Sequence, residues 1–154
     1  MVSPNLTLIV DSREQNPLEF KAGVFNSIKV RGLPVADYWA ELSGKEVPIC
    51  FERKALGDLY GTMTSGYSRF KKELEKAKAF QLKVVLLIEG SLRTVHGGYE
   101  YSKFGGDSML RKLGTLYVRY DLEWHCFEDR RSMAKFIEIT FDACRRNYRR
   151  KKDG

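Results

Sequence analysis

The sequence is poor in the residues that form disulfides and bind most transition metals. Its three cysteines, Cys50, Cys126 and Cys144, form no Cys-x-x-Cys pair, and its two histidines, His96 and His125, are far apart. A disulfide framework, a zinc finger and a histidine-metal nuclease motif all need more of these residues at closer spacing. We therefore expect reduced, mostly buried thiols, and any bound metal ion should be held by oxygen.

Long apolar runs are also missing. No stretch approaches the roughly 18 apolar residues of a membrane span, and residues 1–5 lack the basic start and apolar stretch of a signal peptide. The sequence thus predicts a protein without a membrane partner, soluble and intracellular: cytoplasmic in a prokaryote or virus, nuclear in a eukaryote. Its 154 residues, of which 43% are hydrophobic, suit a single domain over residues 1–154.

Positive charge is unevenly distributed along the chain. The net charge is +7, but residues 145–154 alone carry six Lys or Arg and one Asp, which leaves only +2 for the other 144 residues. The basic tail is suited to follow a phosphate backbone, and a solvated helix end would have the same composition. The body of the domain is nearly balanced, so the tail is the first place to expect affinity for an anionic partner.

Hydrophobic patterning predicts an α/β protein. The apolar run at residues 6–10 predicts a strand that ends on Asp11, and residues 38–42 and 47–54 predict a hairpin joined by residues 43–46, with Pro48 at an edge or bulge. Further strands are expected at residues 24–30, 83–88 and 123–127. Helices are expected along Tyr67, Phe70, Leu74 and Ala77 with Thr64 or Ser65 as cap, over residues 108–120, and after Asp129. We expect a central mixed sheet flanked by helices, with a loop at residues 90–106.

The strand at residues 47–54 carries a carboxylate and an ammonium on one face. Side chains alternate along a strand, so Cys50, Glu52 and Lys54 point to one side and Phe51 and Arg53 to the other. Glu52 and Lys54 are then about 7 Å apart, too far for a tight ion pair. Hydrolysis of a phosphodiester needs a divalent ion, an oriented water and a cation near the phosphate. Asp37, just before the preceding strand, is the candidate for the second carboxylate that magnesium requires.

These residues resemble a known family when they are taken in order. The sequence contains Val10-Asp11-Ser12-Arg13-Glu14, then Ala36-Asp37-Tyr38, then Glu52-Arg53-Lys54 followed by Asp58. This order resembles the signature of the XPF-type structure-specific DNA nucleases: Gly-Asp, a spacer, Glu-Arg-Lys, three residues and Asp. The similarity extends more loosely to Leu86-Leu87-Ile88-Glu89-Gly90, and so covers most of the chain.

The resemblance implies a restriction-endonuclease-like fold and a magnesium-dependent endonuclease, with manganese able to substitute. It implies that Asp37 and Glu52 hold the metal and that Lys54 steers the attacking water. Asp11 and Glu14 are similar to the family's upstream acids and would complete the metal shell or bind a second ion. Asp58 would orient the site or cap the next helix, with Arg13 and Arg53 in supporting positions. By alternation the Arg53 side chain should face away from Lys54 and fix neighbouring acids or the other layer of the sheet, while its carbonyl can reach the metal.

The sequence departs from the family pattern in two places. Ala36 stands where the family has Gly, so we expect any backbone angle that requires glycine there to be relaxed. A helix-hairpin-helix domain, which many relatives use to bind duplex DNA, is missing from these 154 residues. We expect a set of basic residues to contact DNA instead: Arg69, Lys71, Lys72, Arg145, Arg146, Arg149 and Arg150. Tyr99, Tyr101 and Phe104 either stack on nucleic acid or pack their own loop.

Three functional hypotheses remain open from the sequence. The first is cleavage of flapped, branched or nicked DNA in repair or recombination. The second is a catalytically silent DNA-binding or scaffold subunit of a nuclease heterodimer, against which the retained Asp37, Glu52, Lys54 and Asp58 argue. The third is an RNA nuclease, or a phage-type enzyme outside repair, on the same fold. The resemblance also implies a homodimer or heterodimer, with the apolar last two helices as the candidate contact.

Overall fold

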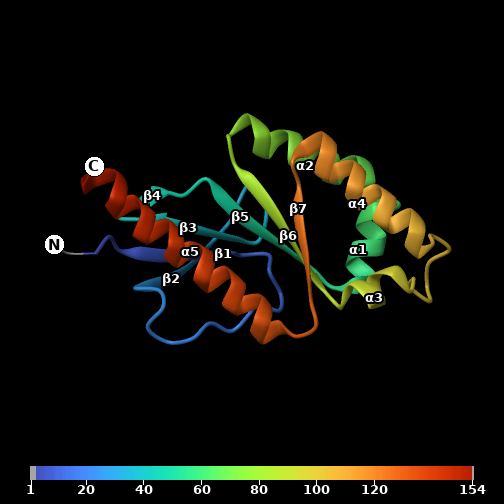
Figure 1. Ribbon diagram of the computed structural model, residues 1–154, viewed down its shortest axis with the longest axis horizontal. Helices are drawn as coiled ribbons and strands as arrows, with labels where there is room; N and C mark the ends of the chain where they lie inside the picture. The colour runs from blue at the N-terminus through green and yellow to red at the C-terminus, as the bar shows by residue number, and fades with distance from the viewer. Residues whose placement is uncertain (1–2, 154) are drawn as a thin grey trace.

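Within residues 3–153, seven strands form a single mixed sheet that has helices on both faces (Figure 1). The computed structural model describes residues 3–153, and for residues 148–153 only the course of the final helix. The strands are β1 (Leu6–Asp11), β2 (Ser27–Arg31), β3 (Tyr38–Leu42), β4 (Lys45–Glu46), β5 (Ile49–Lys54), β6 (Lys83–Glu89) and β7 (Glu123–Phe127). Their order is β2-β1-β3-β5-β6-β7, with β4 paired to β3. The predicted mixed sheet flanked by helices is confirmed.

In the described part of the chain, five helices connect and cover the strands: α1 (Leu56–Met63), α2 (Tyr67–Ala79), α3 (Leu92–His96), α4 (Gly106–Tyr120) and α5 (Arg130–Asp153). The β5-helix-β6 crossover expected from the buried run at residues 83–88 is present, because β6 pairs parallel to β5. Two short helices, α1 and α3, were not predicted. The apolar spacing of Leu56, Leu59, Tyr60 and Met63 is a helical signal that would have located α1.

Several element boundaries differ from the predicted ones for local reasons. Strand β2 begins at Ser27 because Asn26 pairs with Leu6 through both its backbone N–H and its side-chain oxygen. The hairpin turn contains only Ser43 and Gly44, both with positive φ, so β4 begins at Lys45 and Pro48 separates it from β5. Helix α2 is capped at Gly66, one or two residues after the predicted Thr64 or Ser65.

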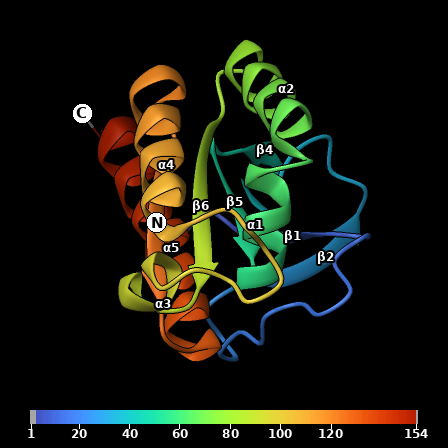
Figure 2. The same ribbon diagram turned by 90° about the vertical axis from the view of Figure 1, so that its right-hand side faces the viewer.

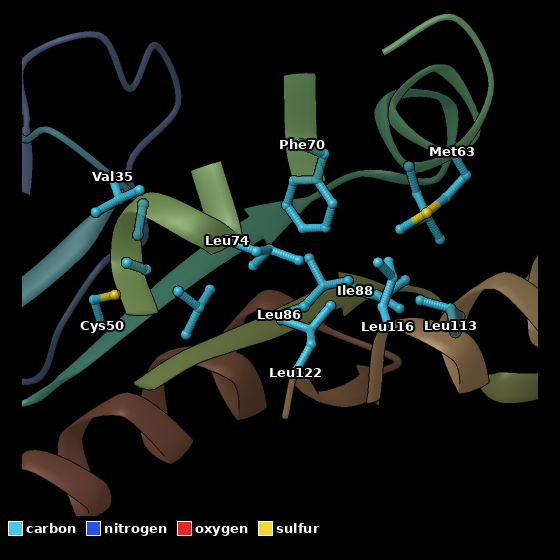
Figure 3. Close-up of a cluster of buried hydrophobic side chains, with 14 of the residues drawn as sticks. Val35, Cys50, Met63, Phe70, Leu74, Leu86, Ile88, Leu113, Leu116 and Leu122 are labelled. Atoms are coloured by element: carbon cyan, nitrogen blue, oxygen red, sulfur yellow. The ribbon is translucent and has the colours of Figure 1, made fainter. Parts of the chain in front are cut away.

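Two hydrophobic cores lie on opposite faces of the sheet. On one face, α1, α2 and α4 pack against Cys50, Leu86 and Ile88, as Figure 3 shows for part of this cluster. On the other face, α5 and the segment between β1 and β2 pack against Phe51, Leu87 and their neighbours. The alternation predicted for the strand at residues 47–54 is therefore confirmed, with Cys50 facing one core and Phe51 the other. All three cysteines are unpaired, and Cys50 is buried.

Helix α5 runs the length of the sheet. Its first residue, Arg130, contacts Glu89 at the carboxyl end of β6, and its far end lies beside β4 (Figure 1). With a rise of about 1.5 Å per residue, Arg145 is about 22 Å along the helix from Arg130. The basic residues 145–153 thus continue α5. Within residues 3–153, no helix combines the length and apolar character needed to cross a membrane.

Candidate active site

The acids on β1, before β3 and on β5 that were predicted to carry the chemistry lie along one edge of the sheet. Strands β1 and β5 both pair antiparallel to β3, so Asp11 at the end of β1 and Lys54 at the end of β5 share an edge with Asp37, which directly precedes β3. Backbone hydrogen bonds join these segments: the Asp11 N–H donates to the Asp37 carbonyl at 2.8 Å, and the Asp37 N–H donates to the Phe51 carbonyl at 2.9 Å. Sheet register therefore fixes the position of Asp37 beside Glu52.

Glu52 and Lys54 form an ion pair on the face covered by α1 and α2. Their Cβ spacing predicted that they would be too far apart to pair, but Lys54 Nζ lies 3.4 Å from Glu52 Oε1. This part of the expectation is wrong because the four-carbon lysine side chain spans the gap between alternate strand positions. Lys54 is therefore held at the carboxylate beside which the reaction is expected.

Glu52 is buried and Asp37 is partly buried, and both carboxylates lie in a setting that disfavours negative charge. Burial raises the pKa of Asp37 to about 6, although the Arg53 backbone N–H donates to its Oδ2 at 2.8 Å. Burial and the nearby charge of Asp37 together raise the pKa of Glu52 to about 8. A divalent cation between these groups would relieve both penalties, so the donor set fits a hard metal ion.

Hydrogen bonding also leaves ligand positions open at the site. Oδ1 of Asp37 and Oε2 of Glu52 have no hydrogen-bond partner among the residues whose side chains are described. Within the same residues, however, no three or more His, Cys, Asp or Glu side chains come together as a ready metal cluster. Of the four acids expected to surround a metal, Asp37 and Glu52 thus form a pair, and the two others lie apart from it.

Those two others, Asp11 and Glu14, are each occupied by an arginine. Asp11 Oδ2 accepts from Arg13 Nε at 3.0 Å, and its Oδ1 accepts from the Leu33 N–H at 2.9 Å. Arg13 in turn donates to the Leu33 carbonyl at 2.6 Å. This arrangement anchors the segment that leads to Asp37, and it leaves the mostly exposed Arg13 side chain at the rim of the site.

Arg53 lies on the opposite face, as alternation predicted, and fixes the neighbouring acids. It donates to Glu14 through Nε and Nη2, at 3.1 and 2.8 Å, and to Glu89 through Nη1 at 2.6 Å. Arg130 also donates to Glu89, at 2.7 Å. Burial alone would raise the pKa of Glu14, but the hydrogen bonds from Arg53 and from the Asn16 N–H hold it below its usual range. Glu14 is therefore ionised and paired away from Glu52.

Two acids at the site were not among the predicted residues. Glu73 on α2 contributes to the raised pKa values of Glu52 and Arg13, so its carboxylate lies within electrostatic range of both. Its place next to the inward-facing Phe70 and Leu74 could have suggested this orientation. Glu89 was noticed only as part of a loose sequence similarity, yet it joins Arg53 to Arg130.

The remaining predicted residues lie around this centre. Asp58 is exposed in the first turn of α1, where a negative charge suits the helix dipole, but the cap is Ala55 and the predicted cap by Asp58 is wrong. Arg69 and Lys72 are exposed on α2, whereas Lys71 lies over the Tyr67 ring. Arg145 and Arg146 both pair with Asp142. The side chains of Arg149 and Arg150 lie outside the described residues.

The position of Ala36 differs from the sequence expectation. We expected the backbone to relax where Ala replaces the family's Gly, but Ala36 has a φ of 64°, in the left-handed region. The neighbouring hydrogen bonds of Asp37 hold this conformation in place. An L-residue there is strained by about 1–2 kcal/mol relative to glycine. The chain thus keeps the geometry that presents Asp37 and accepts the strain.

We expect Ala36→Gly to stabilise the protein by up to about 1 kcal/mol, because relief of strain exceeds the entropy that glycine adds to the unfolded chain. Urea unfolding of the two proteins measures this. The matched control is Ala40→Gly, a buried position in the middle of β3, which should lose about 1 kcal/mol. A loss of stability from Ala36→Gly equal to the control's would contradict the strain at Ala36.

The raised pKa values predict an unusual pH dependence for the metal-free protein. A carboxyl whose folded pKa is raised contributes stability that is fully present below its unfolded pKa and is lost as pH rises through the folded value. This window extends from about 4 to about 6 for Asp37 and from about 4.5 to about 8 for Glu52. In EDTA, the free energy of unfolding should fall between about pH 4 and pH 8, and Glu52→Gln should flatten the profile. A wild-type profile as flat as that of the variant would argue against the raised pKa values.

Comparisons with known proteins identify the family of the chain and support its fold. The family described as the ERCC4 domain matches residues 10–140. Among solved structures, XPF from Aeropyrum pernix superposes with a TM-score of 0.67 at 18% identity, over 96% of this chain and 69% of that one. XPF from Aeropyrum pernix in complex with DNA gives a TM-score of 0.63 at 18% identity, over 96% and 66%. At this identity the likeness is one of fold. No curated protein sequence matches the chain.

Proposed function

The chain belongs to the ERCC4 domain family, and from this premise we propose that it is a magnesium-dependent endonuclease that hydrolyses DNA. We propose flapped, branched or nicked duplexes, such as arise in DNA repair and recombination, as its substrates. The observation that carries this proposal is the proximity of the buried Glu52 to the partly buried Asp37, with Lys54 paired to Glu52. Two desolvated carboxylates next to a lysine are costly for stability and suited to catalysis.

The side chains of the pair have distinct roles in this proposal. Asp37 and Glu52 would hold magnesium, or manganese in its place, with the carbonyl of Arg53 as a further oxygen donor; the ion would neutralise charge that develops on the phosphate. Lys54 Nζ orients the attacking water near Glu52. Asp37 is itself fixed by the Arg53 N–H, so the strand that carries Lys54 also positions the first metal ligand.

In this scheme, Asp11 and Glu14 stay paired with Arg13 and Arg53. For either acid to bind a second ion, Arg13 or Arg53 would have to release it. We therefore propose a site built on Asp37 and Glu52, in which Asp11 positions the segment before Asp37 and Glu14 holds Arg53. Glu73 supplies a further negative charge from α2.

One observation favours a second candidate, the catalytically silent subunit. Only two of the four predicted ligands are available to a metal, since Asp11 and Glu14 are paired with arginines. Titration calorimetry separates the candidates: a nuclease should bind magnesium or manganese, and Glu52→Gln should abolish the heat. A scaffold subunit should show no binding even before the substitution.

Cleavage of labelled DNA tests the proposed activity directly. Flap, nicked and intact duplexes, and the same flap made of RNA, are incubated with the purified protein and magnesium, manganese or EDTA. We expect metal-dependent cuts in the flapped or nicked DNA. Cleavage that persists in EDTA, or the absence of cleavage with either metal, would contradict the proposal, and preferential cleavage of the RNA flap would assign the activity to RNA.

We also propose where DNA and a second subunit bind. Arg69 and Lys72 lie exposed on the helix that carries Glu73, whereas Arg145 and Arg146 are at the far end of α5, so α2 offers the nearer phosphate contacts. Dimerisation through the last two helices stays a proposal. Their exposed apolar side chains include Tyr117 and Val118 on α4 and Ile139 on α5.

A further inference from the structure

Three tyrosines form a ladder of rings from the core to the surface. Tyr60 on α1 is buried, and its hydroxyl donates to the Val95 carbonyl at 2.7 Å. The centroid of the Tyr99 ring lies 5.8 Å from that of Tyr60 and 5.4 Å from that of Tyr101. Tyr101 is 79% exposed, the largest aromatic surface among the exposed apolar residues described. Each ring packs against the next, so the exposed Tyr101 ring is held in place by Tyr99, which in turn packs against the buried Tyr60.

The ladder stands next to the proposed active site. Tyr99 approaches α1 so closely that a Cβ atom on Gly57 would lie 2.8 Å from its hydroxyl, so only glycine fits there without a shift. Gly57 follows Lys54 by three residues, and their Cα atoms are therefore at most about 11 Å apart. Figure 2 shows the segment after α3 reaching across to α1 before it turns back to α4. Tyr101 thus stands within a few nucleotide lengths of Lys54.

The chemistry of this segment favours a ring contact over a charge contact. Residues 97–105 contain one acid, Glu100, and one base, Lys103, both exposed, so the segment carries no net charge. The Phe104 ring is partly buried and packs against the core. Its centroid lies 6.3 Å from that of Tyr60 and 4.9 Å from Lys112 Nζ. Phe104 is therefore part of the loop's own packing, and Tyr101 is the ring left available.

We propose that Tyr101, backed by Tyr99, stacks on an unpaired nucleobase within a few nucleotides of the phosphate that is cut, and so selects substrates with single-stranded nucleotides in that stretch. The inference rests on the proposed nuclease function, whose substrate class it names. Stacking on an aromatic ring tolerates any base and requires that the base has left the duplex. A flap or a frayed junction offers such a base, whereas an intact or nicked duplex keeps it stacked.

The test compares Tyr101→Ala with Tyr101→Phe and with Phe80→Ala, an exposed aromatic residue at the end of α2 whose loss should leave binding unchanged. Binding is measured in EDTA by fluorescence anisotropy with a single-stranded oligonucleotide and a duplex. Tyr101→Ala should weaken single-strand binding by about 10- to 100-fold and leave duplex binding unchanged. Tyr101→Phe should stay within about 2-fold of wild type because the ring is kept. The dependence of affinity on salt should keep its slope, since no phosphate contact is lost.

Outcomes separate this inference from the proposed function. If the wild type cleaves flap and nicked DNA and Tyr101→Ala lowers only flap cleavage, both are supported. Equal losses on the two substrates, or none, would overturn the stacking role and leave the nuclease standing. If the wild type cleaves neither, the proposed function fails, and the EDTA binding comparison still decides whether Tyr101 binds unpaired bases. A shift in sedimentation with Tyr101→Ala would instead assign the ring to self-association and overturn the inference.

Discussion

Glu52→Gln is expected to abolish DNA cleavage and, at the same time, to make the metal-free protein more stable. Gln keeps the size of the side chain and its acceptor for Lys54 but loses the charge that holds a cation. The buried carboxylate, whose pKa is raised to about 8 by burial and by Asp37, is then gone from the site. One substitution should therefore move activity and stability in opposite directions, which a purely structural role for Glu52 would not allow.

The magnitudes follow from the role of each group. Loss of a ligand that helps to neutralise transition-state charge should lower kcat/KM on flap DNA by at least about 10³-fold. The free energy of unfolding in EDTA at pH 8 should rise by about 1 kcal/mol or more. Glu41→Gln makes the same chemical change in β3 beside the exposed Arg31, and should change either quantity little. Residual activity near wild type in Glu52→Gln, or a loss of stability, would refute the assignment.

Arg53→Met is expected to produce the largest loss of stability among these variants. The Arg53 side chain is only 12% exposed and pairs with Glu14 and Glu89, which are themselves largely buried. Methionine keeps much of the volume but leaves Glu14 as a buried charge without its partner. Breaking one side of a buried ion pair costs about 3–5 kcal/mol, because the remaining charge stays desolvated. Urea unfolding at pH 7 measures the change.

Two further variants show whether the cost arises from the unpaired charge. Adding Glu14→Gln to Arg53→Met removes the charge left behind and should recover part of the lost stability. Arg31→Met breaks a pair of similar geometry with Glu41 and Glu46, but the Arg31 side chain is 44% exposed, so the loss should stay below about 1 kcal/mol. Equal losses at positions 53 and 31 would show that burial of the network contributes nothing.

The predicted site was most accurate where it depended on one strand. Alternation along β5 placed Glu52 and Lys54 on one face and Arg53 on the other, and the structure has them so. It could not show that Lys54 folds back onto Glu52, because strand spacing describes Cβ atoms and the ends of long side chains move independently of it. The short helix α1 was missed although its apolar spacing was visible in the sequence.

Prediction was weakest where the pairing of charged side chains decides which acids stay available to a metal. Asp11 and Glu14 are of the residue types that bind metal ions, but in the structure Asp11 forms an ion pair with Arg13 and Glu14 with Arg53. The basic residues at the end of the chain were expected to contact DNA, and the direction of α5 places Arg145 at the other end of the sheet from the candidate site. Neither outcome follows from charge counts.

The sequence alone was enough to predict the alternation of β5, the buried parallel strand β6 and the acid and lysine types that suit phosphodiester chemistry, because each depends on neighbours along the chain. Only the tertiary structure decided that Asp37 lies beside Glu52, that Ala36 keeps a left-handed backbone, and that the exposed Tyr101 packs on Tyr99 beside α1. These depend on sheet register and on the packing of helices, which join segments that the sequence separates. Local sequence patterns thus predicted the residue types of the candidate site, and contacts between distant segments determined its geometry.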